Sequence, residues 1–282
     1  MRKTVRCRLE GDSPTGGAVG DPDAGPSSAV EAAPLGAVSR LWHHGRVKFA
    51  AEDQNYLKQR ELFSAETGPR ELWGVVDHWP LYAGVANLAR YLSISDLLRS
   101  TLGVPGHVAE FGTWRGATLM LLAKLLRIHD PSGPKVVHCF DTFEGLSAFA
   151  DEDGDASKDA GRYRGSYEEL LELMTLYDLG DDIDIHRGLI EDSLPALIER
   201  RPEISFSFVY CDTDLYDSTA TILRELAPRV VAGGLIVFDE WNTERWPGEG
   251  IAVNEYLNEN VGIFTVEAPL HTRQPTLALR KR

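Results

Sequence analysis

The sequence predicts an α/β fold with a mostly parallel sheet and helices on both of its faces. Three observations predict this fold. An apolar run, a glycine turn and a helical stretch follow one another over residues 108–126. Four more short apolar runs alternate with helical stretches further along, which indicates parallel strands joined by crossover helices. Acidic residues close several of these runs, and ligands of such sheets gather at the carboxyl ends of the strands.

Helices are expected before the first strand. Residues 1–40 are rich in small and polar residues without hydrophobic periodicity, so we expect a disordered leader there. Residues 41–103 are expected to form an N-terminal helical segment that serves as a lid or an oligomerisation contact. One helix is predicted over Phe49 to Phe63, and two or three more between Glu71 and Leu102, covering one face or edge of the sheet.

The remaining residues, 104–282, are expected to form the ligand-binding domain, and its first strand and turn organise it. Val108 to Phe111 is the predicted strand. Gly112 and Gly116 supply the conformational freedom and close approach that a tight turn needs. The apolar run from Ala117 to Leu126 is helical in length. Such a turn presents free backbone N–H groups to a ligand.

The later elements repeat this unit. The predicted strands and helices are, in order, Lys135–Phe140, Tyr167–Leu179, Ile183–Arg187, Ser193–Arg200, Ser205–Cys211, Ala220–Val230 and Leu235–Phe238. Gly180 is expected to stop the first of these helices, and Asp192 to cap the second. A helix near Ile251 to Asn258 and an antiparallel hairpin formed by residues 263–267 and 276–279 complete the fold.

The charge of the chain limits its partners. Its 43 acidic and 29 basic residues give a formal net charge of −14 at pH 7, which repels phosphate backbones and anionic lipid. We therefore expect neither nucleic acid nor a membrane surface as a partner. We also expect no signal peptide and no membrane span. The 3 cysteines are widely spaced without a C-x-x-C pair, which favours the reducing cytoplasm.

The glycine turn points to a particular cofactor. Its spacing departs from the dinucleotide fingerprint G-x-G-x-x-G, so a nicotinamide cofactor is disfavoured. The run Glu110-Phe-Gly-Thr-Trp-Arg-Gly116 and Asp141 resemble the first two motifs of class I S-adenosylmethionine-dependent methyltransferases, an acidic-x-Gly-x-x-x-Gly turn and an acidic residue closing the next strand. The resemblance implies a Rossmann-like sheet with an antiparallel C-terminal strand. A carboxylate at Asp141 is placed to accept both ribose hydroxyl protons, and its alternative role is a helix cap.

A narrower resemblance covers about residues 104–257. Five motifs occur in the order found in the TylF-like family of macrocin-type sugar O-methyltransferases, at residues 110–116, 141–146, 179–188, 212–219 and 233–240. This resemblance implies a Mg²⁺-dependent enzyme that transfers a methyl group from S-adenosylmethionine to a hydroxyl of a deoxysugar, in a natural product or its nucleotide precursor. From the cysteine content we expect a cytoplasmic protein, and we also expect a homo-oligomer.

The resemblance also assigns site residues. It implies a cofactor site that comprises Glu110, Gly112, Thr113, Gly116, Asp141, Thr142, Phe143, Gly188 and Asp212. It implies a Mg²⁺ site at Asp212, Asp239 and Glu240. Many relatives carry two aspartates after the fifth strand, and the longer side chain of Glu240 departs from that pattern. Gly188 is interpreted as a turn glycine close to the adenine.

Elementary geometry supports a metal independently of the family. Asp212 and Asp239 close consecutive strands, so they lie about 5 Å apart if those strands are neighbours. Two carboxylates that close repel one another, and a hard divalent cation such as Mg²⁺ removes the repulsion while keeping positions for water and substrate oxygens. The ion lowers the pKa of a bound hydroxyl, and a nearby carboxylate removes its proton. We assign Asp212 as base and ligand, with Asp214 competing for the role of base.

Other residues have structural alternatives. Asp239 could cap the segment after its strand, and Glu240 could be a solvated surface acid. His138 and His186 are interpreted as packing or surface histidines rather than metal ligands. The acidic run Asp151–Asp155 lacks the order of an EF-hand and is interpreted as a solvated loop. Beside it, residues 162–164 (Arg-Tyr-Arg) are within reach of a nucleotide-sugar phosphate.

Three alternatives to a sugar methyltransferase stay open at this point. A catechol or another phenolic diol is a chemically similar acceptor, and only an acceptor panel separates it from a sugar. A nicotinamide-dependent oxidoreductase uses the same type of sheet. A non-catalytic nucleotide-binding protein is disfavoured, because converging acids are costly to bury without a function.

Overall fold

A computed structural model describes residues 54–55, 57–63, 65, 68, 70–241, 243–269 and 272–282. The predicted leader at residues 1–40 lies outside the described residues, as does the start of the helical segment. The described residues of the 54–63 range are helical, in agreement with the helix predicted over Phe49 to Phe63.

A seven-stranded sheet forms the centre of the fold, which confirms the α/β prediction. Its strands are β1 (His107–Phe111), β2 (Val137–Asp141), β3 (Ile183–Arg187), β4 (Phe206–Cys211), β5 (Val230–Phe238), β6 (Phe264–Glu267) and β7 (Leu277–Lys281). They lie in the order β3-β2-β1-β4-β5-β7-β6. The first five are parallel, and β7 is antiparallel to both of its neighbours. The predicted C-terminal hairpin is therefore confirmed.

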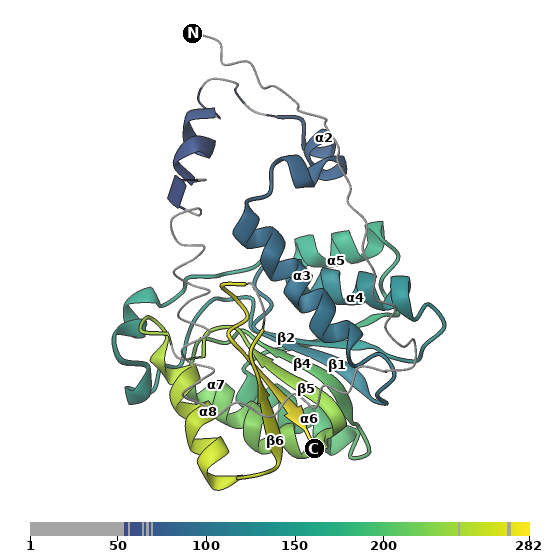
Figure 1. The fold of residues 1–282 in the computed structure, drawn as a ribbon, viewed down its shortest axis with the longest axis vertical. Coiled ribbons are helices and arrows are strands. Elements are labelled where there is room, and N and C mark those ends of the chain that lie inside the picture. Colours follow the sequence, from purple (N-terminus) through teal and green to yellow (C-terminus); the bar gives the residue numbers. More distant parts are fainter. Residues whose placement is uncertain are drawn as a thin grey trace, which may run out of the picture. The chain divides into compact units, whose positions relative to one another are not determined.

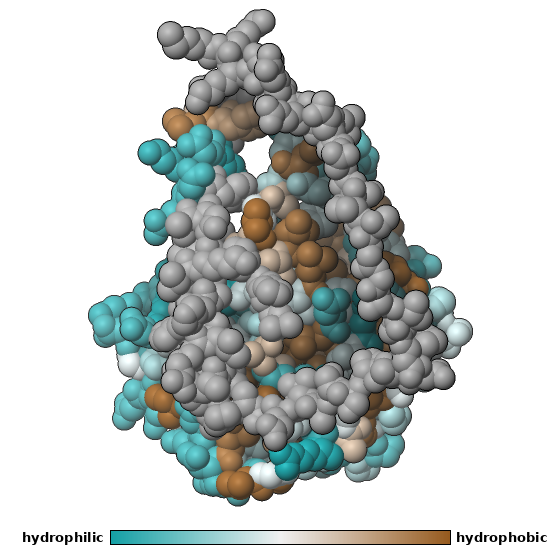
Figure 2. All heavy atoms as spheres, viewed as in Figure 1, coloured by the Kyte–Doolittle hydropathy of each residue, from teal (hydrophilic) through white to brown (hydrophobic). Residues whose placement is uncertain are grey.

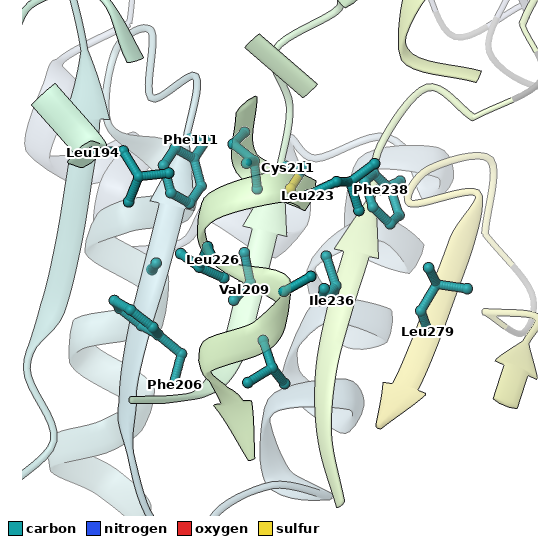
Figure 3. Packing of buried hydrophobic residues seen from close by; sticks show 14 of the residues in the cluster. Phe111, Leu194, Phe206, Val209, Cys211, Leu223, Leu226, Ile236, Phe238 and Leu279 are labelled. Atoms are coloured by element: carbon teal, nitrogen blue, oxygen red, sulfur yellow. The ribbon is translucent and has the colours of Figure 1, made fainter. Parts of the chain in front are cut away.

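Helices cover both faces of the sheet (Figure 1). On one face lie α3 (Val85–Arg99), α4 (Ala117–His129) and α5 (Tyr167–Leu176); on the other lie α6 (Ile190–Arg200), α7 (Tyr216–Glu225) and α8 (Pro247–Glu259). Strand residues alternate between two apolar clusters, because successive side chains of a strand point to opposite faces. Val108 packs with Ile94 of α3, whereas Phe111 packs in the cluster that contains Leu194 of α6 (Figure 3).

Two helix starts differ from the prediction. The helix α6 begins at Ile190 with Leu189 as its N-cap residue, so the assignment of Asp192 as a cap is wrong. Asp192 lies in the first turn of α6, where its charge is favourable towards the helix dipole. The helix α7 begins at Tyr216, earlier than predicted. The last predicted residue of that helix, Val230, is instead the first residue of β5 and pairs with Phe206.

The acidic run before α5 is not simply a solvated loop. Residues Asp151–Asp159 form a 3-10 helix, and Asp153 is completely buried. Its two carboxylate oxygens accept hydrogen bonds from the backbone N–H groups of Ala150 and Tyr216, each at 2.8 Å. The interpretation as a solvated loop is therefore wrong for Asp153, which ties this segment to the start of α7.

The segment before β1 leaves apolar side chains exposed. It contains α2 (Leu72–Asp77), which Glu71 caps by accepting from two backbone N–H groups, the 3-10 helix Trp79–Leu81, and α3. Leu72, Leu81 and Val85 are each more than 60% exposed. Figure 2 shows hydrophobic side chains gathered over α2 and α3. A role as lid or oligomer contact stays a prediction. No helix within the described ranges has the length and apolar character needed to cross a bilayer.

Candidate active site

A cavity of about 700 Å³ lies at the carboxyl ends of the parallel strands. The predicted site residues that line it are Gly112, Asp141, Thr142, Gly188, Asp212, Asp214, Asp239 and Glu240. A smaller cavity of about 240 Å³ adjoins the glycine turn and is lined by Glu110, Gly112, Thr113 and Asp212 among others. Gly116 and Phe143 line neither cavity. The sheet thus gathers most of the predicted residues at one place.

Glycine is required at both predicted positions of the turn, for different reasons. Gly112 has φ +80°, and a Cβ there would lie 1.9 Å from the carbonyl oxygen of Asp212. The chain after β1 therefore passes directly against the chain after β4. Gly116 has φ +84° and precedes α4, where a Cβ would lie 2.7 Å from a methyl carbon of Leu170. Gly112 brings the turn to the cavity, whereas Gly116 allows close helix packing.

Asp141 holds the glycine turn in place. Its Oδ2 accepts hydrogen bonds from the backbone N–H groups of Thr113 at 2.6 Å and Trp114 at 2.8 Å, and its Oδ1 accepts from the N–H of Phe143 at 2.6 Å. Burial nevertheless raises the pKa of this carboxyl above its ordinary value. A carboxylate offers about four lone-pair positions, so three backbone donors leave capacity for one ribose hydroxyl rather than for both, as was expected. The helix-cap alternative is wrong, since Asp141 caps no helix of the described residues.

The other predicted residues of the turn are buried. The Glu110 side chain is 1% exposed, and its Oε2 accepts from the hydroxyl of Thr113 at 2.8 Å. Burial raises the pKa of Glu110 to about 8, which favours the protonated acid at neutral pH. Phe143 has φ +61° and packs its ring against Tyr167 in the apolar core. Phe143 therefore contributes to the site through its backbone N–H, which donates a hydrogen bond to Asp141.

Asp212 and Asp239 lie side by side, as predicted, because β4 and β5 are neighbours. A guanidinium nitrogen of Arg90, from α3, stands between them. Arg90 Nη2 lies 2.9 Å from Asp212 Oδ2 and 3.2 Å from Asp239 Oδ1. The hydroxyl of Tyr210 also donates to Asp239. The repulsion that predicted a metal is thus balanced here by an arginine, and the Asp239 carboxylate is engaged by Arg90 and Tyr210.

This arrangement tests whether the acids suit Mg²⁺. One oxygen from each of Asp212 and Asp239 points to a single position, and carboxylate oxygens are the ligands that Mg²⁺ prefers. The donor set therefore fits the ion. Arg90 Nη2 stands at that position, so the guanidinium has to move before an ion can be held by both carboxylates. Burial, with the adjacent charge of Asp239, raises the pKa of Asp212 to about 8.

Three further acids surround this pair. Asp214 is 8% exposed with φ +65°, and burial together with the charge of Asp212 raises its pKa well above the ordinary range. Glu240 is 7% exposed and accepts a hydrogen bond from Gln274, so its interpretation as a surface acid is wrong. Its backbone N–H donates to Oε1 of Glu249 at 2.8 Å. Glu249 is fully buried, and its Oε2 has no hydrogen-bond partner within the described chain.

Aromatic and basic side chains also line the cavity. Tyr163 lies between Trp114 and Trp246, with ring centroids 5.6 and 6.2 Å away. Arg245 lines the cavity and pairs with Asp159 at 3.1 Å. Of the residues predicted to reach a phosphate, Tyr163 lines the cavity, whereas Arg162 and Arg164 do not. Arg162 is instead paired with Asp159.

Sequence reasoning missed two residues of the site. Arg90 lies about 120 positions before Asp212 in the chain. No motif surrounds it in the sequence that would indicate a role in the site. Glu249 lies outside the five motifs of the family resemblance, after the last of them. A weak indication existed for Glu249, since it follows Pro247 at a helix start, where acidic residues are common. Its complete burial depends on the packing of α8.

The sequence matches a known protein family and curated proteins. The family described as macrocin O-methyltransferase (TylF) matches residues 76–271. Demethyldecarbamoylnovobiocin O-methyltransferase of Streptomyces niveus is 32% identical over 174 residues, 58% of this chain and 64% of that protein. Mycinamicin III 3''-O-methyltransferase of Micromonospora griseorubida is 28% identical over 167 residues, 56% of this chain and 63% of that protein. The chain therefore spans less than two thirds of the length of these curated relatives.

Solved structures show the same fold. The crystal structure of CalS11, a calicheamicin methyltransferase, superposes with a TM-score of 0.71 at 25% identity, covering 81% of this chain and 92% of that chain. The O-methyltransferase NovP gives a TM-score of 0.58 at 25% identity, covering 70% and 80%.

Proposed function

The chain belongs to the macrocin O-methyltransferase family, as its motifs predict, and from this premise we propose that it transfers a methyl group from S-adenosylmethionine to a sugar hydroxyl of a natural product. The acceptor is a deoxysugar, either in a finished glycoside or in its nucleotide precursor. The named activities of the curated relatives, which include O-methylation of novobiocin and mycinamicin intermediates, support this proposal.

A single observation carries the proposal. One cavity is lined both by the glycine turn, together with Asp141, whose carboxylate holds that turn in place, and by the acids that follow β4 and β5. The glycine turn and Asp141 are suited to binding the nucleoside and the charged amino-acid part of the cofactor. The acids after β4 and β5 are suited to activating a hydroxyl of the acceptor. A methyl donor and an acceptor bound to these two groups would meet within the same cavity.

S-adenosylmethionine supplies a methyl group on a positively charged sulfur, which a hydroxyl oxygen attacks. The residues of this chain then have separate tasks. Gly112 admits the ligand close to the backbone, and Asp141 retains one free acceptor position for a ribose hydroxyl. Asp212 or Asp214 accepts the proton of the acceptor hydroxyl as the new carbon–oxygen bond forms and the carbon–sulfur bond breaks. Both carboxylates line the cavity, and both assignments of the base stay open.

We propose that Mg²⁺ assists this step, held by Asp212, Asp239 and Glu240. The ion would lower the pKa of a sugar hydroxyl bound to it. Supporting this, the carboxylate oxygens of Asp212 and Asp239 already converge on one position, occupied by the Arg90 guanidinium. Glu240 lines the same cavity. For both carboxylates to hold the ion, the Arg90 guanidinium would have to withdraw from between them.

The test is methyl transfer to a panel of glycosides, nucleotide sugars and catechols, with product identified by mass spectrometry. We expect product with sugar acceptors, and loss of activity with a chelator that Mg²⁺ restores. Asp212→Asn and Asp214→Asn should show which carboxylate is the base, with a loss of about 10²–10⁴-fold. Asp192→Asn, an exposed acid on α6, is the matched control.

Each part of the proposal has its own contrary result. Activity that is unaffected by chelator would remove the metal while leaving the methyl transfer intact. Product with catechols alone would assign a phenolic acceptor. Turnover that survives in both Asp212→Asn and Asp214→Asn would remove the carboxylate base.

A further inference from the structure

Three potential metal ligands from neighbouring strands meet on the α6 face of the sheet. In the parallel pair of β2 and β3, His138 stands opposite Asp184, and Phe140 stands opposite His186. Residues two apart in a strand share a face, so all three polar side chains project together. His138 Nδ1 lies 3.0 Å from His186 Nε2, and Asp184 Oδ2 lies 3.5 Å from each of these nitrogens.

We propose that His138, Asp184 and His186 bind a divalent transition-metal ion of the Zn²⁺ type, in place of the interpretation of both histidines as packing or surface residues. Ligand atoms at about 2.0–2.1 Å from a tetrahedral ion lie about 3.3–3.4 Å from one another. The three separations in this cluster lie on either side of that value. Two imidazole nitrogens and one carboxylate oxygen favour Zn²⁺ over Mg²⁺. Three protein ligands leave the fourth position for water.

A hydrogen bond between two imidazoles explains only part of this geometry. It accounts for the 3.0 Å contact between His138 and His186. It leaves Asp184 at 3.5 Å from both rings, beyond the usual range of an N–H···O bond. A carboxylate oxygen within 3.5 Å of both nitrogens is compatible with three ligands of one ion. The metal therefore uses all three groups, whereas the hydrogen bond uses two.

The surroundings of the two imidazole rings favour their neutral, metal-binding form. The side chains of His138 and His186 are 1% and 5% exposed, whereas Asp184 is 51% exposed and offers a route from solvent. Burial lowers the pKa of His138 to about 3 and also lowers that of His186, so both rings are neutral, the form that binds metals. Arg200, the last residue of α6, and Arg201, which follows it, add positive charge nearby, which limits the affinity.

The proposed ion would connect the edge strand to the rest of the sheet. The strand β3 is at the edge and pairs only with β2 among the described strands. Both strands lead into the cavity, at Asp141 and Gly188, and the N–H of Gly188 donates to the carbonyl of Asp141 at 3.1 Å. An ion held by both strands would fix this part of the cavity wall. The inference does not depend on the proposed methyl transfer.

The test uses the full chain, freed of metal with a chelator and titrated with Zn²⁺ by calorimetry. Two variants remove ligands: Asp184→Asn changes an exposed side chain, and His186→Gln removes a ring nitrogen. We expect Zn²⁺ to bind the parent chain, and to bind each variant at least about tenfold more weakly. His129→Gln, an exposed histidine of α4, is the control and should bind as the parent does.

Two further measurements use the same proteins. Co²⁺ in place of Zn²⁺ should give the intense visible absorption of a tetrahedral site in the parent chain and not in Asp184→Asn. Zn²⁺ should raise the melting temperature of the parent and leave that of Asp184→Asn unchanged. The proposal is overturned if the parent chain binds no Zn²⁺, or if Asp184→Asn and His129→Gln bind it equally well.

Discussion

Replacement of Arg90 by glutamine tests how the acids of the cavity are balanced. Glutamine keeps the helix propensity of α3 and removes the charge. The change leaves Asp212 and Asp239 without their common partner, and Asp239 is 1% exposed. Removing one member of a buried ion pair costs about 3–5 kcal/mol, and the partial exposure of Arg90 and Asp212 lowers this to about 2–4 kcal/mol. The variant should therefore be clearly less stable in metal-free buffer.

Mg²⁺ should reverse much of this loss. In the parent chain the ion has to displace the guanidinium, whereas in Arg90→Gln both carboxylates are free to receive it. We expect the affinity for Mg²⁺ to rise at least about tenfold in the variant, which corresponds to about 1.4 kcal/mol. Arg90 is not fully hydrogen-bonded in its present position, since its Nε is buried without a hydrogen-bond partner in the described chain. This favours exchange between guanidinium and ion.

Thermal unfolding with and without Mg²⁺, together with calorimetric titration, measures both effects. For a domain of this size each kcal/mol shifts the melting temperature by about 2–4 °C. Arg99→Gln is the matched control, because Arg99 lies on the same helix and pairs only with the exposed Asp96 among described residues. Equal Mg²⁺ affinity in the parent, Arg90→Gln and Arg99→Gln would refute the idea that arginine and ion share the two carboxylates.

Three other substitutions give distinct outcomes. Gly112→Ala should unfold the chain or destabilise it by about 4 kcal/mol or more in denaturant titrations, because the added Cβ meets a backbone oxygen at a position with positive φ. The control is Gly180→Ala, which has open space around it and should change the stability by less than about 1 kcal/mol. Glu110 binds its proton more tightly in the folded chain, so its contribution to stability declines between pH 4.5 and about 8, by up to about 1.4 kcal/mol per pH unit. Glu110→Gln should remove that slope from a plot of unfolding free energy against pH. Asp141→Asn should weaken S-adenosylmethionine binding in calorimetry, since an amide nitrogen cannot accept from the turn; unchanged binding would contradict that role.

Local sequence was sufficient to predict that the five parallel strands exist and where they end, but not where β5 begins, because Val230 was predicted to be helical. The ends of β2, β4 and β5 were located because an acidic residue follows each apolar run, and parallel strands bring such ends to one edge. The predicted bounds of β3 agree with the structure. Helix starts were harder. Asp192 resembles an N-cap residue because acids favour both the cap and the first turn, and only the position of Leu189 in the fold separates the two.

The chemistry of the site depended on packing that sequence does not show. The close approach of Asp212 and Asp239 was predicted correctly, with a metal as the expected counter-charge. The counter-charge from Arg90 could not be predicted, because the sequence does not show that α3 brings this residue to the ends of β4 and β5. The burial of Asp153 likewise depends on contact with the start of α7. The pairing of His138 with His186 depends on the register of two strands.

The most direct measurement of the central claim is methyl transfer from isotopically labelled S-adenosylmethionine to a deoxysugar glycoside, followed by mass spectrometry of the acceptor. We expect label on a sugar oxygen with the parent chain, and at least about a hundredfold less with the double variant Asp212→Asn, Asp214→Asn. Binding of S-adenosylmethionine without transfer to any sugar or phenolic acceptor, or no binding at all, would contradict the proposed function.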